Sequence, residues 1–144
     1  MAAILSKFQF VDHKITKMLV ELPIGYKGER SESINYFATY AMEYHDDFWN
    51  GSVTIGFRQQ SKDAENPTTL YEIIISGRFT YSGENNEETE KEFVKFLKSS
   101  GAATLIPIAR AAITSAGAIS GYPGICTIPN INVYQMNWIE PEKA

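Results

Sequence analysis

One group of residues in the sequence has the chemistry to bind a metal ion. Glu43, His45, Asp46 and Asp47 place carboxylates beside an imidazole. On an extended strand, however, only Glu43 and His45 would point the same way. Aspartates are also favoured in turns, and no second histidine is close enough to complete a site. We therefore predict a structural turn here and no bound metal.

The other reactive residue types also lack partners for catalysis. Cys126 is the one cysteine and has no histidine at a readable spacing, so we expect a packed thiol. His13 is isolated, and a surface position on a strand is expected for it. The sequence contains no G-x-S-x-G motif, phosphate-binding glycine loop or dinucleotide fingerprint. The prediction is a protein that is not an enzyme and uses no cofactor.

Arg110 is the one charged residue in an apolar, small-residue-rich segment, residues 102–133. An unpaired buried arginine would be costly, so we expect it to pair with a carboxylate or with backbone carbonyls. The first part of this segment approaches the length of a membrane span, which needs about 20 apolar residues. A central charge and an alanine-rich composition disfavour insertion into lipid. Burial inside a protein assembly is the remaining prediction.

Composition narrows the class of protein further. The 144 residues are 44% hydrophobic, enough to form a core, and we expect one domain over residues 1–144. A net charge of −4 without a basic cluster argues against nucleic-acid binding, and it would favour basic partners by long-range attraction. A single cysteine and no visible export signal predict a cytoplasmic protein.

The elements expected to position these residues are strands within residues 8–82 and helices within residues 87–140. Period-two patterns predict strands over residues 8–22, 34–44, 53–57 and 71–81. Short connections between them predict an antiparallel sheet, with Asn50-Gly51 offering a tight turn. The class predicted is α+β, with a four-stranded antiparallel sheet followed by C-terminal helices.

Two helices are predicted after the sheet. The first covers residues 87–100, with Asn86 as its cap and Gly101 closing its end, and the second covers residues 104–120. The second helix has no polar face, so one sheet cannot cover it. We expect Ala109, Ala112 and Ala116 to contact another subunit.

The apolar segment resembles the SecB family of protein-export chaperones. The similar motifs are the Pro107-x-x-Arg110 helix start, Tyr122-Pro123 at its end and the following Pro129-x-x-Asn132 segment, with Ser76-Gly77-Arg78-Phe79 upstream. The resemblance implies helices buried between sheets in a dimer of dimers, a homotetramer. It implies ATP-independent binding of unfolded preproteins and their transfer to the translocase motor SecA for protein transport.

The resemblance also implies particular site residues. Those of a peptide-binding groove are Ile34, Tyr36, Ala38, Tyr122, Ile125 and Ile128. Those of a contact with the motor are Glu21, Leu70 and Glu72. Lys17 stands where the family has an acid, so this patch departs from the family pattern.

Two alternatives remain open at this stage. One is a SecB-like chaperone dedicated to a single client, such as the antitoxin of a toxin–antitoxin pair. The other is a hotdog-like thioesterase, an enzyme built from a similar sheet and long helix. The thioesterase would need a carboxylate or histidine beside the apolar helix, where only Arg110 is charged.

Overall fold

A computed structural model describes residues 5–21, 34–62, 65–66, 68–121 and 126–142. Four long strands come first: β1 (Phe8–Val20), β2 (Asn35–His45), β3 (Phe48–Gln60) and β4 (Thr69–Tyr81). They are followed by α1 (Glu87–Phe96), the π-helical turn η1 (Leu97–Gly101), α2 (Ala102–Ile119) and the 3₁₀ turn η2 (Val133–Gln135). The predicted α+β class, an antiparallel sheet followed by C-terminal helix, is confirmed.

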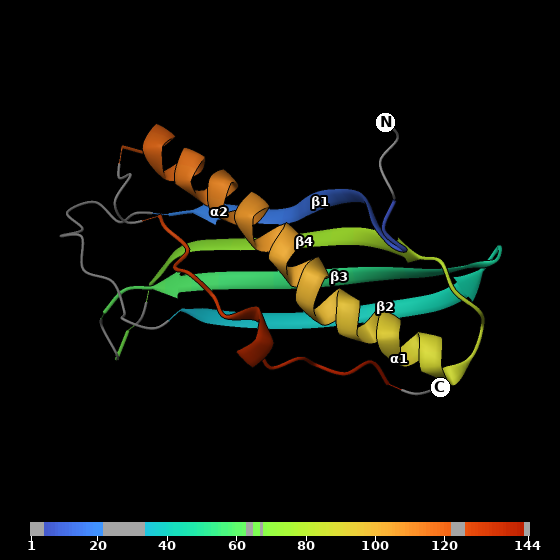
Figure 1. Cartoon of the computed structure of the whole chain (residues 1–144). Helices are drawn as coiled ribbons and strands as arrows, with labels where there is room; N and C mark the ends of the chain where they lie inside the picture. Colours follow the sequence, from blue (N-terminus) through green and yellow to red (C-terminus); the bar gives the residue numbers. More distant parts are fainter. Residues whose placement is uncertain (1–4, 22–33, 63–64, 67, 122–125, 143–144) are drawn as a thin grey trace.

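The sheet has the strand order β1-β4-β3-β2, and every neighbouring pair is antiparallel. Figure 1 shows β1 and β2 at its two edges. The β2–β3 connection is a tight turn with φ of 54° at Asp46 and 68° at Asp47. Both values lie in the left-handed region, which aspartate tolerates better than most residues. The predicted turn at these two aspartates is therefore confirmed.

The tight turn expected at Asn50-Gly51 is wrong, because both residues lie inside β3. The side chain of Asn50 donates to the carbonyls of His45 and Phe48, at 3.2 and 3.1 Å, and so secures the nearby hairpin. Gly51 lies beneath the helix: a Cβ there would be 2.7 Å from Cζ of Phe93. Glycine at this position serves close packing and not chain reversal.

The prediction of two separate helices is also wrong. Helix runs without interruption through α1, η1 and α2, from Glu87 to Ile119. Gly101, expected to end the first helix, keeps a helical φ of −62°. A Cβ there would lie 3.1 Å from Cγ2 of Val53, so glycine lets the helix approach β3 closely. The cap is confirmed: the Asn86 side chain accepts a 2.8 Å bond from the Thr89 amide.

The long helix crosses one face of the sheet diagonally (Figure 1). The core between them is built from alternate residues of the strands and from one side of the helix. Its fully buried large side chains include Ile55, Phe57, Tyr71, Ile73, Ile75, Phe79, Phe93, Leu97, Leu105 and Ile113. Burial of these apolar surfaces is the main contribution holding the helix on the sheet.

Polar pairs mark the opposite face of the sheet. Thr54 and Ser76 share a hydrogen bond of 2.7 Å, and Asp12 pairs with Arg78. The guanidinium of Arg78 lowers the pKa of Asp12. This alternation, apolar toward the helix and polar away from it, is typical of an antiparallel sheet covered on one side.

The long helix is also apolar enough to suit a membrane span by length and composition alone. Its most apolar window has a mean hydropathy of 1.4, and 33% of that window is buried inside the chain. The side that faces the sheet belongs to the core, with Leu105, Ala109 and Ile113 fully buried. Core helices satisfy the same length and composition test, so packing on the sheet accounts for this side of the helix.

Candidate functional site

The candidate site lies at β2, an edge strand of the sheet. Period-two alternation turns Tyr36, Ala38 and Tyr40 toward the helix side. Their exposed fractions are 36%, 0% and 8%. Among the residues that the structure describes, no strand of the sheet lies beside the outer backbone edge of β2, and such edges can accept an additional extended segment.

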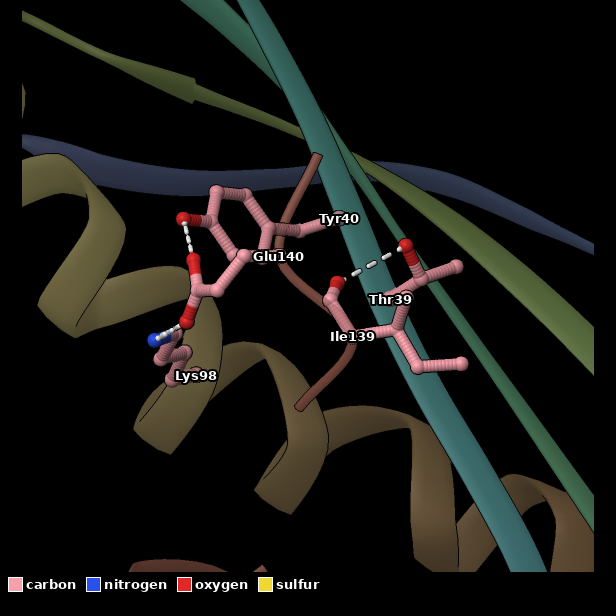
Figure 2. Close-up of polar contacts among 5 residues, drawn as sticks. All are labelled: Thr39, Tyr40, Lys98, Ile139 and Glu140. Atoms are coloured by element: carbon pink, nitrogen blue, oxygen red, sulfur yellow. Dashed lines mark hydrogen bonds and ion pairs between the residues drawn. The ribbon is translucent and has the colours of Figure 1, made fainter. Parts of the chain in front are cut away.

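An extended segment of the chain itself lies on this edge. We call residues 136–140 the C-terminal strap. Ile139 forms a parallel bridge with Thr39, and its amide donates to the Ala38 carbonyl at 2.8 Å. The Thr39 hydroxyl donates to the Ile139 carbonyl at 3.2 Å (Figure 2). Further along, the Asn137 amide donates to the Tyr36 hydroxyl at 2.8 Å. The strap is thus held largely through its backbone.

Side chains close the strap onto the long helix. The Trp138 ring meets the Tyr40 ring edge-on, with centroids 6.2 Å apart. The Tyr40 hydroxyl donates to one carboxylate oxygen of Glu140, and the Lys98 ammonium binds the other (Figure 2). Lys98 also lies 5.3 Å from the centroid of the Tyr40 ring. Helix, edge strand and strap therefore meet at one carboxylate.

This arrangement changes the pKa of the Tyr40 hydroxyl and of the Glu140 carboxyl in opposite directions. Burial, and then the hydrogen bond to Glu140, raises the pKa of Tyr40 above its usual range. The hydrogen bond from Lys98, and then the one from Tyr40, lowers the pKa of Glu140 below its ordinary 4.5. Tyr40 remains a proton donor at neutral pH, and Glu140 remains an anion that accepts from both partners.

The strap should loosen when Glu140 is protonated. The pKa of Glu140 is lower on the strap than in a free chain. The contribution of its carboxylate to holding the strap is therefore present above pH 4.5 and is lost as the pH falls through the lowered pKa. We expect the fluorescence of Trp138 to shift to the red over that range. The Glu140→Gln variant should show no such transition. An equal transition in that variant would assign it to another group.

A cavity of about 480 Å³ separates the helix from the strap. Three lysines of the helix line one side of it, Lys91, Lys95 and Lys98, and the strap provides Met136 and Trp138. Glu140 also lines the cavity and pairs with Lys98, and Lys91 pairs with Glu87 at 3.3 Å. The cavity thus combines a lysine row that is partly neutralised with apolar and aromatic walls. Such a lining suits an elongated ligand with an apolar body and a negative group.

The predicted groove residues are only partly brought together. Tyr36 and Ala38 lie under the strap, but Ala38 is fully buried and reachable only through its backbone. Ile34 packs partly buried against the core, and Ile128 is 3% exposed. In this arrangement Ala38 and Ile128 belong to the core of the chain, and the peptide-binding role of these positions stays a prediction. Tyr122 and Ile125 lie outside the described residues.

Sequence reasoning missed the residues that hold the strap: Tyr40, Lys98, Trp138 and Glu140. Tyr40 shares the period-two face of Tyr36, and this signal could have identified it. Nothing in the sequence links Lys98 to Glu140, because the two meet only after the chain returns along β2.

The residues expected to contact a motor lie on β4 and just after β1, away from the β2 edge but level with the start of β2. Leu70 is fully buried, so a partner cannot reach its side chain in this arrangement. The Glu21 amide donates to the Leu70 carbonyl at 2.9 Å. Glu72 pairs with Lys17 across β1 and β4, and with Arg58 at 3.8 Å. The unusual Lys17 therefore neutralises the acid that the resemblance assigned to this contact.

The residues expected at a subunit interface differ in how exposed they are. Ala109 is fully buried in the core of this chain and offers no surface to a partner. Ala112 and Ala116 are half-buried at the margin of the helix. Arg110 donates to the carbonyls of Ile128 and Pro129, at 2.9 and 3.0 Å. Its expected pairing with backbone carbonyls is confirmed.

The candidate metal ligands do not converge. His45 lies 3.0 Å from Asp46, and both side chains are largely exposed at the hairpin turn. Within the described ranges, no three His, Cys, Asp or Glu side chains are grouped so as to hold a metal ion. The side chain of Cys126 is fully buried.

The sheet, the long helix crossing it and the returning C-terminal segment define a SecB-like fold. A solved structure with this arrangement is the SecB-like chaperone Rv1957 of Mycobacterium tuberculosis, in complex with a ChAD peptide from the HigA1 antitoxin Rv1956. The two chains are similar with a TM-score of 0.51 over 88% of this chain and 91% of that one, at 14% sequence identity. No model of a known protein family and no curated protein matches the sequence.

Proposed function

We propose that the protein is an ATP-independent chaperone that binds non-native polypeptides in extended form at the β2 edge. The observation that carries this proposal is the strap, an extended segment seated on that edge by backbone hydrogen bonds and aromatic contact. A site that accepts one extended segment through its backbone has little need of a particular sequence. The SecB-like fold supports the same function, since the neighbour of similar fold holds a peptide.

The binding step follows from the chemistry of the edge. The client backbone pairs with β2 as an additional strand, and its alternate side chains enter the space between the sheet and the helix. Apolar burial at about 25 cal/mol/Å² provides affinity without specificity. No reaction is required of the protein. Arg110 is the one charged residue of helix α2, and its guanidinium donates hydrogen bonds to the carbonyls of Ile128 and Pro129. Helix α2 therefore offers no acid–base pair for a thioesterase.

Two versions of this chaperone function differ in the clients that the protein would bind. General protein export would have the protein work in the cytoplasm as a homotetramer and transfer preproteins to SecA. A dedicated role would have it hold one client, such as an antitoxin. The Lys17–Glu72 pair favours the dedicated role, because it neutralises an acid that the resemblance assigned to motor binding. Pull-down of bound polypeptides, with and without SecA, distinguishes the two.

The test is suppression of aggregation. A stoichiometric amount of the protein should slow aggregation of a chemically denatured test protein, without ATP, as followed by light scattering. The Tyr36→Ser variant should be weaker, because Tyr36 faces the site, whereas Phe48→Ser should match the wild type. Both replacements remove an exposed aromatic ring, and Phe48 lies at the hairpin, away from the strap. Unchanged aggregation in the presence of the wild-type protein would exclude the chaperone function.

A further inference from the structure

The strap has the features of a bound client. It is extended along an edge strand, presents an aromatic side chain to Tyr40 through Trp138, and ends in the carboxylate of Glu140. It also occupies the side of β2 on which client binding is proposed. Anything that binds this edge as an additional strand must first displace the strap, because Ile139 occupies the Ala38 carbonyl.

The hold on the strap is weak enough for displacement. One bridge to β2, at Ile139, and one hydrogen bond from the Asn137 amide to the Tyr36 hydroxyl fix its backbone, and the Ile139 side chain is 61% exposed. The Lys98–Glu140 pair is also open to solvent, with side chains 31% and 58% exposed. Exposed ion pairs of this kind contribute little to stability, and a one-residue bridge is far from a full strand pairing.

The charge around the site selects a type of client. Lys91, Lys95 and Lys98 line the cavity beside the strap, although the chain as a whole has a net charge of −4. Glu87 pairs with Lys91, and the strap's own Glu140 pairs with Lys98, so Lys98 becomes available to a client when the strap leaves. Glu140 shows that a carboxylate fits against Lys98 and the Tyr40 hydroxyl together. Local attraction at contact distance outweighs the long-range field of the whole chain, which salt screens.

We propose that the strap is an internal occupant of the client site, and that the preferred clients are extended segments in which a carboxylate follows an aromatic and an aliphatic residue. This inference rests on the proposed chaperone function and specifies its substrate class. It reverses the expectation of basic clients drawn from net charge. The strap leaves the edge when such a segment binds, and it returns when the client departs.

The first arm of the test measures peptide choice. The probes are two fluorescent peptides that copy residues 134–142 and differ only in Glu or Lys at the position of Glu140. The wild-type protein should bind the Glu peptide about threefold to fivefold more tightly, as expected for a partly exposed ion pair. The Lys98→Glu variant should prefer the Lys peptide. Equal affinities for both peptides in both proteins would overturn the proposed client class.

The second arm releases the strap in the 144-residue chain. Ile139→Pro removes the amide that donates to Ala38, whereas Ile139→Ala keeps it and removes a largely exposed side chain. A tethered competitor acts at a millimolar effective concentration, so Ile139→Pro should bind the Glu peptide at least about tenfold more tightly than Ile139→Ala. Equal binding by the two variants, or a doubled mass in which a second copy takes the edge, would overturn the inference.

The aggregation assay distinguishes failure of the proposed client class from failure of the proposed chaperone function. If the wild type and Ile139→Pro both suppress aggregation but the peptides are not distinguished, the client class is wrong and the chaperone function stands. If neither protein suppresses aggregation, the proposed function fails and the inference fails with it. Circular dichroism of each variant confirms that the fold is retained.

Discussion

Replacing Leu105 with alanine is expected to lower the free energy of unfolding by about 3 kcal/mol, within the usual range for a buried leucine. Leu105 is fully buried at the centre of the contact between α2 and the sheet. A Cβ at Gly77 would lie 2.6 Å from its Cδ2 atom, so the leucine fills the space that this glycine leaves on β4. Its removal leaves a cavity between the two layers.

The measurement is chemical unfolding followed by circular dichroism. Leu5→Ala is the matched control: it makes the same change before β1, where the leucine is 80% exposed. It should change stability by less than about 0.5 kcal/mol. If the two variants were equally stable, the described contact between α2 and the sheet would be wrong.

Gly77 provides a second check on the same contact. Gly77→Ala alone should destabilise the protein, because its Cβ would overlap Leu105. In the Leu105→Ala background the added methyl group enters the vacated space, so the double variant should lose less stability than the sum of the two single variants. Additive losses would show that the two residues do not touch.

The sheet could be predicted from the sequence because its signals are local. Period-two alternation identified the strands, including the shared face of Tyr36, Ala38 and Tyr40. Turn chemistry was less decisive, since both Asp46-Asp47 and Asn50-Gly51 suit a reversal. The structure uses the first pair, and this choice places Gly51 beneath Phe93. The packing of a distant helix, which no local pattern records, decided between them.

The length of the helix also depends on tertiary packing that local sequence patterns do not record. Gly101 has the composition of a helix end, yet here it is a point of close approach to Val53. The continuous helix depends on the sheet below it, and tertiary packing overrides glycine's poor helix propensity. In the candidate site, Arg110 could be anticipated because an isolated charge in an apolar segment needs a partner. Lys98 and Glu140 could not, because each is an ordinary surface residue until the strap brings them together.

The outer side of α2, which faces away from the sheet, is uncharged. The exposed residues of α2 carry no charge: they are Ala103, Pro107, Ala111, Thr114, Ser115, Ala118 and Ile119. The residues beneath, such as Ala109, are already covered by the sheet. An exposed apolar surface of this kind is unusual on a monomer and common at permanent interfaces. We expect the outer side, and not Ala109, to contact a second subunit.

Replacing Ala111 with glutamate should therefore dissociate the assembly. A charge at the centre of an apolar interface would be desolvated without a partner, at a cost of several kcal/mol, which is enough to shift a dimer to monomer at micromolar concentration. Native mass spectrometry should show the wild type as a multiple of 16.1 kDa and Ala111→Glu at 16.1 kDa. The helical circular dichroism signal should persist, because Ala111 is exposed in the single chain.

The matched control is Asn85→Glu, which adds the same charge at an exposed position just before α1. It should leave the mass unchanged. Ala112→Glu would be a less specific test, because Ala112 is half-buried and the charge would disturb the fold as well as the interface. A wild-type protein that is monomeric at 16.1 kDa would contradict the interface and leave the apolar outer side to be explained by the binding of clients.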